Sequence, residues 1–283
     1  MADIAVRNVT KVFGRNQAAG LALAQQGVDK LEILARTGCS LGLKDVNLDI
    51  PHGGIFVVMG LSGSGKSTLV RHLNRLIDPS CGAILFGGQD IMSYDVRALR
   101  DFRRRSVSMV FQGFGLLPHR TVLQNVAFGL ITRGERPPEA YPKAMRWIEV
   151  VGLKGYEAKH PAELSGGMRQ RVGLARALAS DTDTILMDEA FSALDPLIRL
   201  DMQDLLLNLQ KTLNKTIVFI THDLDEAVRI GTRVAVMKDG QVVQVGTPRE
   251  ILDQPADDYV ARFVQSRDRE ATRASTPDNR PAN

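Results

Sequence analysis

Two glycine-rich segments of this chain have the residue types of phosphate-binding loops. The first, residues 60–67, reads GLSGSGKS and completes the P-loop pattern. It lies between a predicted apolar strand and a predicted helix, the context in which this pattern binds phosphate. Its glycines let consecutive backbone N–H groups point at phosphate oxygens, and the helix N-terminus adds positive potential. The residues expected to contact a nucleotide through this loop are Gly60, Ser62, Gly63, Ser64, Gly65, Lys66, Ser67 and Thr68.

Two side chains of this loop have distinct predicted roles. Lys66 would reach the β and γ phosphates, and the Ser67 hydroxyl would ligate Mg²⁺. A flexible Gly-Ser turn without a ligand is the alternative, and the flanking strand and helix argue against it. ATP and Mg²⁺ are therefore the expected cofactors.

Acidic residues follow a second apolar strand pattern at residues 185–187. Asp188 would hold Mg²⁺, through water, and Glu189 would polarise an attacking water as general base. Carboxylates at the carboxyl end of a buried strand stand where an α/β sheet places its ligand chemistry. A solvated pair that caps a helix is the alternative.

Two further polar residues follow strand patterns. His222 ends the apolar run 216–221 and could contact the γ-phosphate and the attacking water, although a lone histidine there is more often structural. Gln112 comes directly after a strand pattern that ends in Val110-Phe111. It could ligate Mg²⁺ and sense whether nucleotide is bound, although alone it indicates little.

The second glycine-rich segment is Leu164-Ser165-Gly166-Gly167, just before a helical pattern. Small residues at a helix N-terminus can form an anion-binding nest. A plain serine N-cap is the alternative. Because one P-loop already holds one triphosphate, a second such loop predicts a nucleotide site shared between two copies of the chain.

Composition is consistent with a globular protein. The chain has 283 residues, of which 44% are hydrophobic, and a formal net charge of +4. The two cysteines, Cys39 and Cys81, lack metal-ligand spacing and are expected to be reduced. We find neither a signal-peptide pattern nor an apolar run of roughly 18 residues, so we expect a soluble chain whose membrane role depends on a partner.

The order of patterns predicts an α/β core. Residues 3–13 and 43–59 read as strands, and 15–42 as a helical insertion between them. A helical block over 112–180 predicts a separate subdomain between core strands. The remaining predicted elements are strands at 184–188, 216–221, 234–237 and 242–245, short strands and a basic helix within 83–111, helices at 67–76, 165–180 and 196–214, and a polar, disordered tail at 266–283.

Together, these residues resemble the ABC transporter ATPase family over residues 1 to about 265. The motifs stand in the family's order: Walker A at 60–67, Q-loop Gln112, signature 164–167, Walker B at 185–188, catalytic Glu189, D-loop 192–195 and switch His222.

The resemblance implies a P-loop NTPase (RecA-like) core with a helical subdomain and antiparallel strands. It also implies a head-to-tail homodimer, in which Ser165, Gly166 and Gly167 of one copy close over ATP on the other's P-loop. Asp195 of the D-loop is a nucleotide-site residue by the same resemblance, and Lys66 and His222 are catalytic with Glu189. Phe13 is the candidate for stacking on adenine, with core packing as the alternative.

A finer resemblance is to the glycine betaine/proline betaine (quaternary amine) uptake subfamily. It depends on the insertion 15–42, on the segments 59–67, 187–199 and 222–227, and on Ala190, where many cassettes have proline. It implies a separate integral-membrane permease, a substrate-binding protein that delivers the cargo, and a peripheral location at the cytoplasmic face of the inner membrane. The segment 114–119 would line the groove that receives a helix of the permease, with subdomain core as the alternative.

Two other functions remain open. The first is an importer ATPase for another solute, such as an amino acid, phosphate or a metal. The second is a soluble ABC protein acting on DNA or ribosomes, which the single cassette and the absence of a clustered basic face argue against. No nucleic-acid partner is expected.

Overall fold

The computed structural model of the chain describes residues 2–265. The predicted disordered tail, 266–283, lies outside the described residues. None of the helices within 2–265 combines the length and the apolar character needed to cross a bilayer.

A six-stranded sheet forms the centre of the molecule, in the order β10-β9-β3-β8-β7-β6. All neighbours in it are parallel except the β9–β10 hairpin. Every residue of β3, β7 and β8 is buried, as expected for parallel strands covered on both faces. The strands are β3 (Ile55–Met59), β6 (Val107–Val110), β7 (Thr184–Asp188), β8 (Thr216–Thr221), β9 (Arg233–Lys238) and β10 (Gln241–Gly246).

Helices cover this sheet on both faces. Along β3, alternate side chains enter different cores: Val57 belongs to the core that includes residues of α9 and α10, and Val58 belongs to the core that includes residues of α3. The helices around the sheet are α3 (Lys66–Leu73), α4 (Val96–Arg105), α9 (Pro196–Leu213), α10 (Leu224–Ile230) and α11 (Pro248–Asp253), with a last helical stretch at residues 258–265.

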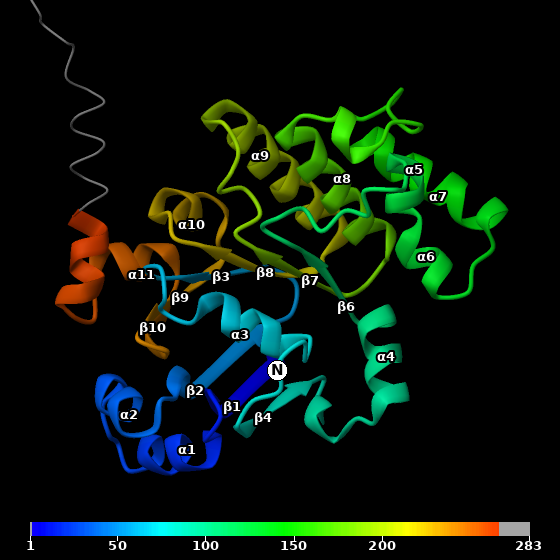
Figure 1. Cartoon of the computed structure of the whole chain (residues 1–283). Helices are drawn as coiled ribbons and strands as arrows, with labels where there is room; N and C mark the ends of the chain where they lie inside the picture. Colours follow the sequence, from blue (N-terminus) through cyan, green and yellow to red (C-terminus); the bar gives the residue numbers. More distant parts are fainter. Residues whose placement is uncertain (1, 266–283) are drawn as a thin grey trace, which may run out of the picture.

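A four-stranded antiparallel sheet, in the order β2-β1-β4-β5, lies across α3 from the central sheet (Figure 1). Its long strands β1 and β2 pair along their whole length, and Ile4, Leu48 and Ile50 face α3. The elements are β1 (Ala2–Phe13), β2 (Ser40–Pro51), β4 (Cys81–Phe86) and β5 (Gln89–Asp90), followed by the turn η1 (Ile91–Ser93).

Two helices, α1 (Gln17–Gln25) and α2 (Lys30–Thr37), separate β1 from β2. They pack on a small core of their own in which Ile33 and Cys39 are buried. The prediction placed the return to strand at residue 43, but β2 already begins at Ser40. Gly38 ends α2 in the left-handed region (φ 67°), and Leu41 pairs with Val12 of β1.

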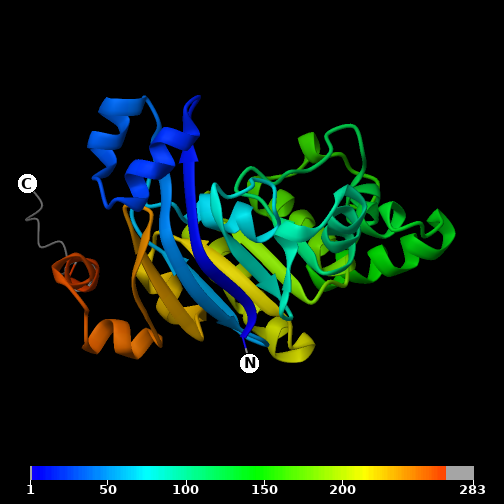
Figure 2. The same cartoon turned by 90° about the horizontal axis from the view of Figure 1, so that it is seen from below.

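The segment between β6 and β7 forms a helical subdomain with its own apolar core. It lies on the opposite side of the molecule from α1 and α2 (Figure 2). Its elements are α5 (Val122–Val126), α6 (Phe128–Thr132), α7 (Pro137–Val150), η2 (Pro161–Glu163) and α8 (Gly166–Ala179).

Other predicted boundaries shift slightly. The strand predicted to end at Phe111 ends at Val110. The predicted helix 196–214 ends at Leu213, because Asn214 adopts a left-handed conformation (φ 49°) and caps it.

Candidate active site

The P-loop joins β3 to α3 at the carboxyl end of the central sheet, where parallel strands deliver their loops. Two of its glycines are required sterically. A Cβ at Gly65 (φ 102°) would come within 2.7 Å of the Gly42 carbonyl oxygen, and one at Gly60 (φ 152°) would overlap the carbonyl of Met237. The loop is therefore fixed against β2 and β9. By contrast, nothing lies within 4 Å of the Cβ position at Gly63.

Lys66 is buried within this loop. Its Nζ donates to the carbonyl oxygens of Gly60 and Leu61, at 2.8 and 2.9 Å. Burial lowers the pKa of the Lys66 ammonium, and the carboxylates of Glu189 and Asp188 oppose that shift. The loop thus holds the Lys66 ammonium where little water reaches it, so a bound anion would interact with it strongly.

The loop also holds an unused polar atom. Ser64 Oγ is buried and has no hydrogen-bond partner among the described residues. An orphaned buried hydroxyl is costly unless a ligand satisfies it. The Ser64 hydroxyl and the Lys66 ammonium can both donate hydrogen bonds to phosphate oxygens, so the loop fits a phosphate group.

Asp188 at the end of β7 is 2% exposed. One carboxylate oxygen accepts a 2.8 Å hydrogen bond from Ser67 Oγ, and the other lies 3.5 Å from an Arg71 nitrogen. Residues 2–265 contain no cluster of three or more His, Cys, Asp or Glu side chains that could enclose a metal. A hydroxyl beside one carboxylate nevertheless fits Mg²⁺, which takes few protein oxygens when phosphates and water complete its shell.

Glu189 lies between two other predicted site residues. Its Oε2 accepts a 3.1 Å hydrogen bond from Gln112 Nε2 and lies 3.7 Å from Nδ1 of His222. Glu189 itself has φ 46°, a left-handed conformation that is uncommon for a residue with a side chain. The ends of β6, β7 and β8 therefore bring these three side chains together.

The signature residues belong to a different lobe. Ser165 caps α8, with its side chain accepting a 3.3 Å bond from the N–H of Met168. Gly166 has open space around its Cβ position. The serine N-cap given as the alternative is therefore present, and Gly166, which is half-buried, keeps open space beside it at the helix N-terminus.

The D-loop connects β7 to α9. Asp195 is the N-cap residue of α9, makes no side-chain capping bond and is exposed. Sequence reasoning missed Arg199, which lies one helical turn further on. Its guanidinium donates to the carbonyl oxygen of Leu194 at 3.2 Å and to Asp223, the neighbour of His222, at 3.4 Å. Spacing alone carries no signal for this contact.

Phe13 ends β1 and is 37% exposed, so it is not part of a core. A Cβ at Gly42 would lie 2.6 Å from the Phe13 ring, and the Gly42 carbonyl faces Gly65 of the P-loop. Gly42 therefore lies between the Phe13 ring and the phosphate loop. Its role in adenine stacking stays a prediction.

The fold and the P-loop define a P-loop NTPase. A family model described as ABC transporter matches residues 43–192. The dimeric ATP-binding cassette MJ0796 superimposes with a TM-score of 0.74 at 32% identity, over 87% of this chain and 99% of that one. The chain belongs to the ABC transporter family.

Two relatives with known names are similar along nearly the whole chain. The glycine betaine/proline betaine transport ATP-binding protein ProV of Escherichia coli K12 is 56% identical over 93% of this chain and 66% of its own length. The glycine betaine transport ATP-binding protein OpuAA of Bacillus subtilis 168 is 53% identical over 94% and 63%. The chain thus spans somewhat less than two thirds of the length of these relatives.

Proposed function

We propose that the chain is the ATP-hydrolysing subunit of an importer that takes up quaternary amine osmolytes through a separate membrane permease. The observation that carries the ATPase activity is the convergence of Glu189 with Gln112 and His222 beside a complete P-loop. The cargo follows from the named relatives, which are similar along 93–94% of the chain.

Each side chain has a defined task in hydrolysis. Glu189 polarises the attacking water and accepts its proton, held in place by Gln112. Lys66 and His222 stabilise the negative charge that spreads over the transferring phosphoryl group. Ser67, Asp188 and Gln112 would hold Mg²⁺, which when bound neutralises phosphate charge.

A second copy completes the site. Ser165, Gly166, Gly167 and Asp195 of one copy would close over the ATP held by the P-loop of the other. The open space at Gly166 leaves the N-terminus of α8 accessible to phosphate oxygens. Dimeric structures of a similar cassette support this arrangement.

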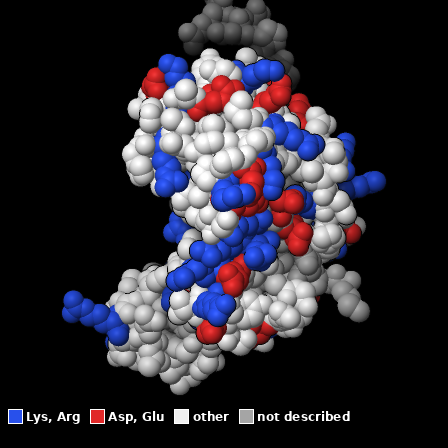
Figure 3. Space-filling model, turned by 90° about the vertical axis from the view of Figure 1, so that its right-hand side faces the viewer, with Lys and Arg blue, Asp and Glu red and all other residues white. Residues whose placement is uncertain are grey.

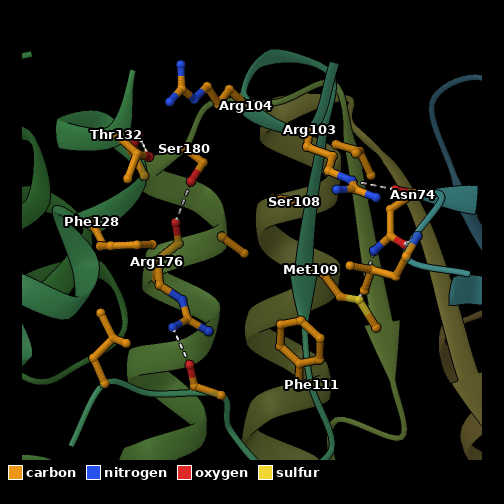
Figure 4. Close-up of a pocket in the computed structure, with 16 residues that line it drawn as sticks. Asn74, Arg103, Arg104, Ser108, Met109, Phe111, Phe128, Thr132, Arg176 and Ser180 are labelled. Carbon is orange, nitrogen blue, oxygen red and sulfur yellow. Dashed lines mark hydrogen bonds between the residues drawn. The ribbon is translucent and has the colours of Figure 1, made fainter. Parts of the chain in front are cut away.

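A cleft between the central sheet and the helical subdomain is the proposed permease groove (Figure 4). It has a volume of about 340 Å³, and its apolar lining includes Met109 and Phe111 on the β6 side and Phe128 on the opposite side. Arg176 lines it from α8 and donates to the Gly115 carbonyl at 2.6 Å, while Arg103 donates to the Asn74 carbonyl at 2.9 Å. An amphipathic helix would bury its apolar side here.

Basic side chains gather on the neighbouring face, which carries α4 and the helical subdomain, with acidic side chains among them (Figure 3). On α4, Arg103 is engaged by backbone carbonyls and Arg104 lies 4.0 Å from Asp101. This mixed pattern favours a solvated face over a lipid-binding one. The chain would therefore be held at the cytoplasmic face of the inner membrane by its permease.

Some relatives of this chain are named for the transport of other solutes. A trimethylamine N-oxide transport protein of Ruegeria pomeroyi is 51% identical over 94% of the chain, and a methionine import protein of Staphylococcus epidermidis is 46% identical over 80%. The higher identity and coverage of the betaine relatives favour a quaternary amine over an amino acid.

A pull-down from detergent-solubilised membranes of the host tests the proposal. We expect a permease together with a protein that binds quaternary amines in an equilibrium binding assay. A permease whose binding protein takes another solute would overturn the cargo and keep the ATPase assignment. Recovery of nucleic acid and no membrane protein would support the soluble alternative.

A further inference from the structure

The last helical stretch of the described chain, residues 258–265, docks beside the P-loop. Its Val260 is fully buried in the main core, and Phe263 and Val264 pack against that core. Tyr259 stands over Lys238, whose Nζ is 5.0 Å from the ring centroid, and meets Phe263 edge to face at 5.1 Å. The phenol is therefore held in one orientation by several contacts.

The hydroxyl of Tyr259 reaches the first peptide of the P-loop. The N–H of Leu61 donates to Tyr259 Oη at 3.2 Å, and that hydroxyl donates to the Met237 carbonyl at 3.0 Å. Burial raises the pKa of Tyr259, so the phenol keeps the proton that it donates. The bonds join the C-terminal helix, the end of β9 and the phosphate loop.

The same peptide unit carries an acceptor of Lys66. The peptide between Gly60 and Leu61 presents its N–H to Tyr259 and its carbonyl to Lys66 Nζ, at 2.8 Å. A line of hydrogen bonds thus runs from the ammonium through one peptide to the phenol and on to β9. Bonds in such a line polarise one another, and each fixes the orientation of the next.

The orientation of the Gly60–Leu61 peptide is weakly fixed by the loop itself, so contacts from other segments are needed to fix it. Gly60 has φ 152°, in a region that glycine reaches readily and other residues do not. The Leu61 side chain is 57% exposed, so packing does little to fix it. Rotation of the Gly60–Leu61 peptide would withdraw the carbonyl from Lys66 and move the start of the loop.

We infer that Tyr259 is a positioning residue of the nucleotide site, whose hydroxyl fixes the first P-loop peptide and thereby makes nucleotide affinity depend on docking of the C-terminal helix. The inference rests on the proposed binding of ATP by the P-loop. It adds a residue that lies 198 positions along the chain from Leu61, to which it is bonded.

The test compares the full-length chain with Tyr259→Phe, which keeps the ring, its contact with Phe263 and its place over Lys238. The substitution removes both hydrogen bonds of the hydroxyl, and losing the one from the Leu61 N–H should weaken ATP binding about three- to tenfold, measured by titration with a fluorescent ATP analogue. The KM for ATP should rise by a similar factor while kcat stays nearly constant. Tyr156→Phe, an exposed tyrosine in the helical subdomain, is the matched control and should change neither.

Two further measurements separate positioning from general destabilisation. The Tm without nucleotide should be close to that of the wild type, and NMR hydrogen exchange at the Leu61 amide should become faster in Tyr259→Phe alone. Wild-type affinity and unchanged Leu61 exchange in Tyr259→Phe would overturn the inference. A wild-type chain that fails to bind ATP would instead overturn the proposed function. If Tyr259→Phe does not fold, Phe263→Leu, which keeps the hydroxyl but loosens its support, must show faster Leu61 exchange for the inference to stand.

Discussion

The side-chain amide of Gln112 donates a 3.1 Å hydrogen bond to Oε2 of Glu189, the same oxygen that lies 3.7 Å from Nδ1 of His222. Gln112 follows β6, Glu189 follows β7 and His222 follows β8, which are neighbours in the central sheet. The chain continues from Gln112 into the helical subdomain. A rotation of that subdomain would therefore move Gln112, which is hydrogen-bonded to Glu189. The proposed general base is therefore connected to the lobe that would contact the permease.

Replacing Glu189 by Gln tests the proposed base. The amide can still be held beside Gln112 but cannot accept a proton, so phosphate release should fall about 10²- to 10⁴-fold. ATP should bind with wild-type affinity and hold two copies together as a dimer in gel filtration. Glu149→Gln, an exposed glutamate paired with Lys154, is the control and should hydrolyse normally. Normal turnover in Glu189→Gln would remove Glu189 from the mechanism.

The central strands and the residues at their ends could be predicted because each signal is local. Strands β7 and β8 are buried on both faces, so their sequences are unbroken apolar runs that end abruptly in polar residues. Parallel pairing then places Asp188, Glu189 and His222 at one edge. The P-loop is local in the same way, because its glycines and Lys66 lie within eight consecutive residues.

Contacts between segments that are distant in the sequence leave no local sequence pattern from which they could be predicted. Arg199 is one of several charged residues on an amphipathic helix, and its contact with Asp223 arises only from the packing of α9 on α10. Tyr259 reads as an ordinary half-buried aromatic. The start of β2 was misplaced although Leu41 and Leu43 already alternate with Ser40 and Gly42. Glycine is uncommon in strands, so the sequence pattern assigns Gly42 to the preceding helical insertion.

Replacing Phe13 by Ala tests its predicted stacking on adenine. Base–aromatic stacking contributes about 1–3 kcal/mol per base, so ATP affinity should fall about five- to 150-fold. Phe13→Trp should retain affinity because it keeps an aromatic face. Leu31→Ala, at an exposed apolar residue of α2, is the control for loss of surface area. A lowered Tm with unchanged ATP affinity would instead show that Phe13 serves packing.

The proposed groove can be tested at Leu76, which lines it and is 50% exposed. An aspartate there puts a charge where the permease helix would bury its apolar side, so co-purification with the permease should be lost. ATP hydrolysis by the isolated chain should be unchanged, because Leu76 lies outside the nucleotide site. Leu31→Asp carries the same substitution on the far side of the molecule and should still recover the permease. Equal recovery with both variants would place the docking surface elsewhere.

Glu226 on α10 gives a pH dependence of stability with a definite sign. Its side chain is buried and accepts a 3.1 Å bond from Gln203 Nε2. Burial raises its pKa above 4.5, Asp223 adds to that shift, and hydrogen bonds from Thr221 and Gln203 and the charge of Arg199 oppose it. The folded chain therefore holds this proton at pH values where the unfolded chain releases it. The resulting stabilisation is complete below pH 4.5 and is lost as pH rises through the folded pKa.

Glu226→Gln should remove that dependence. The amide carries no charge at any pH, and its Oε1 can accept the same bond from Gln203, so the variant should equal or exceed the wild type in Tm at neutral pH. Oε1 of Gln203, which has no partner among the described residues, can accept a bond from the new amide. Thermal unfolding followed from pH 5 to 8 should show the difference in Tm growing as pH rises, and Glu149→Gln should show none. A variant that is less stable at every pH would mean that Glu226 is charged in the folded chain and that its carboxylate, rather than the neutral acid, is the stabilising form.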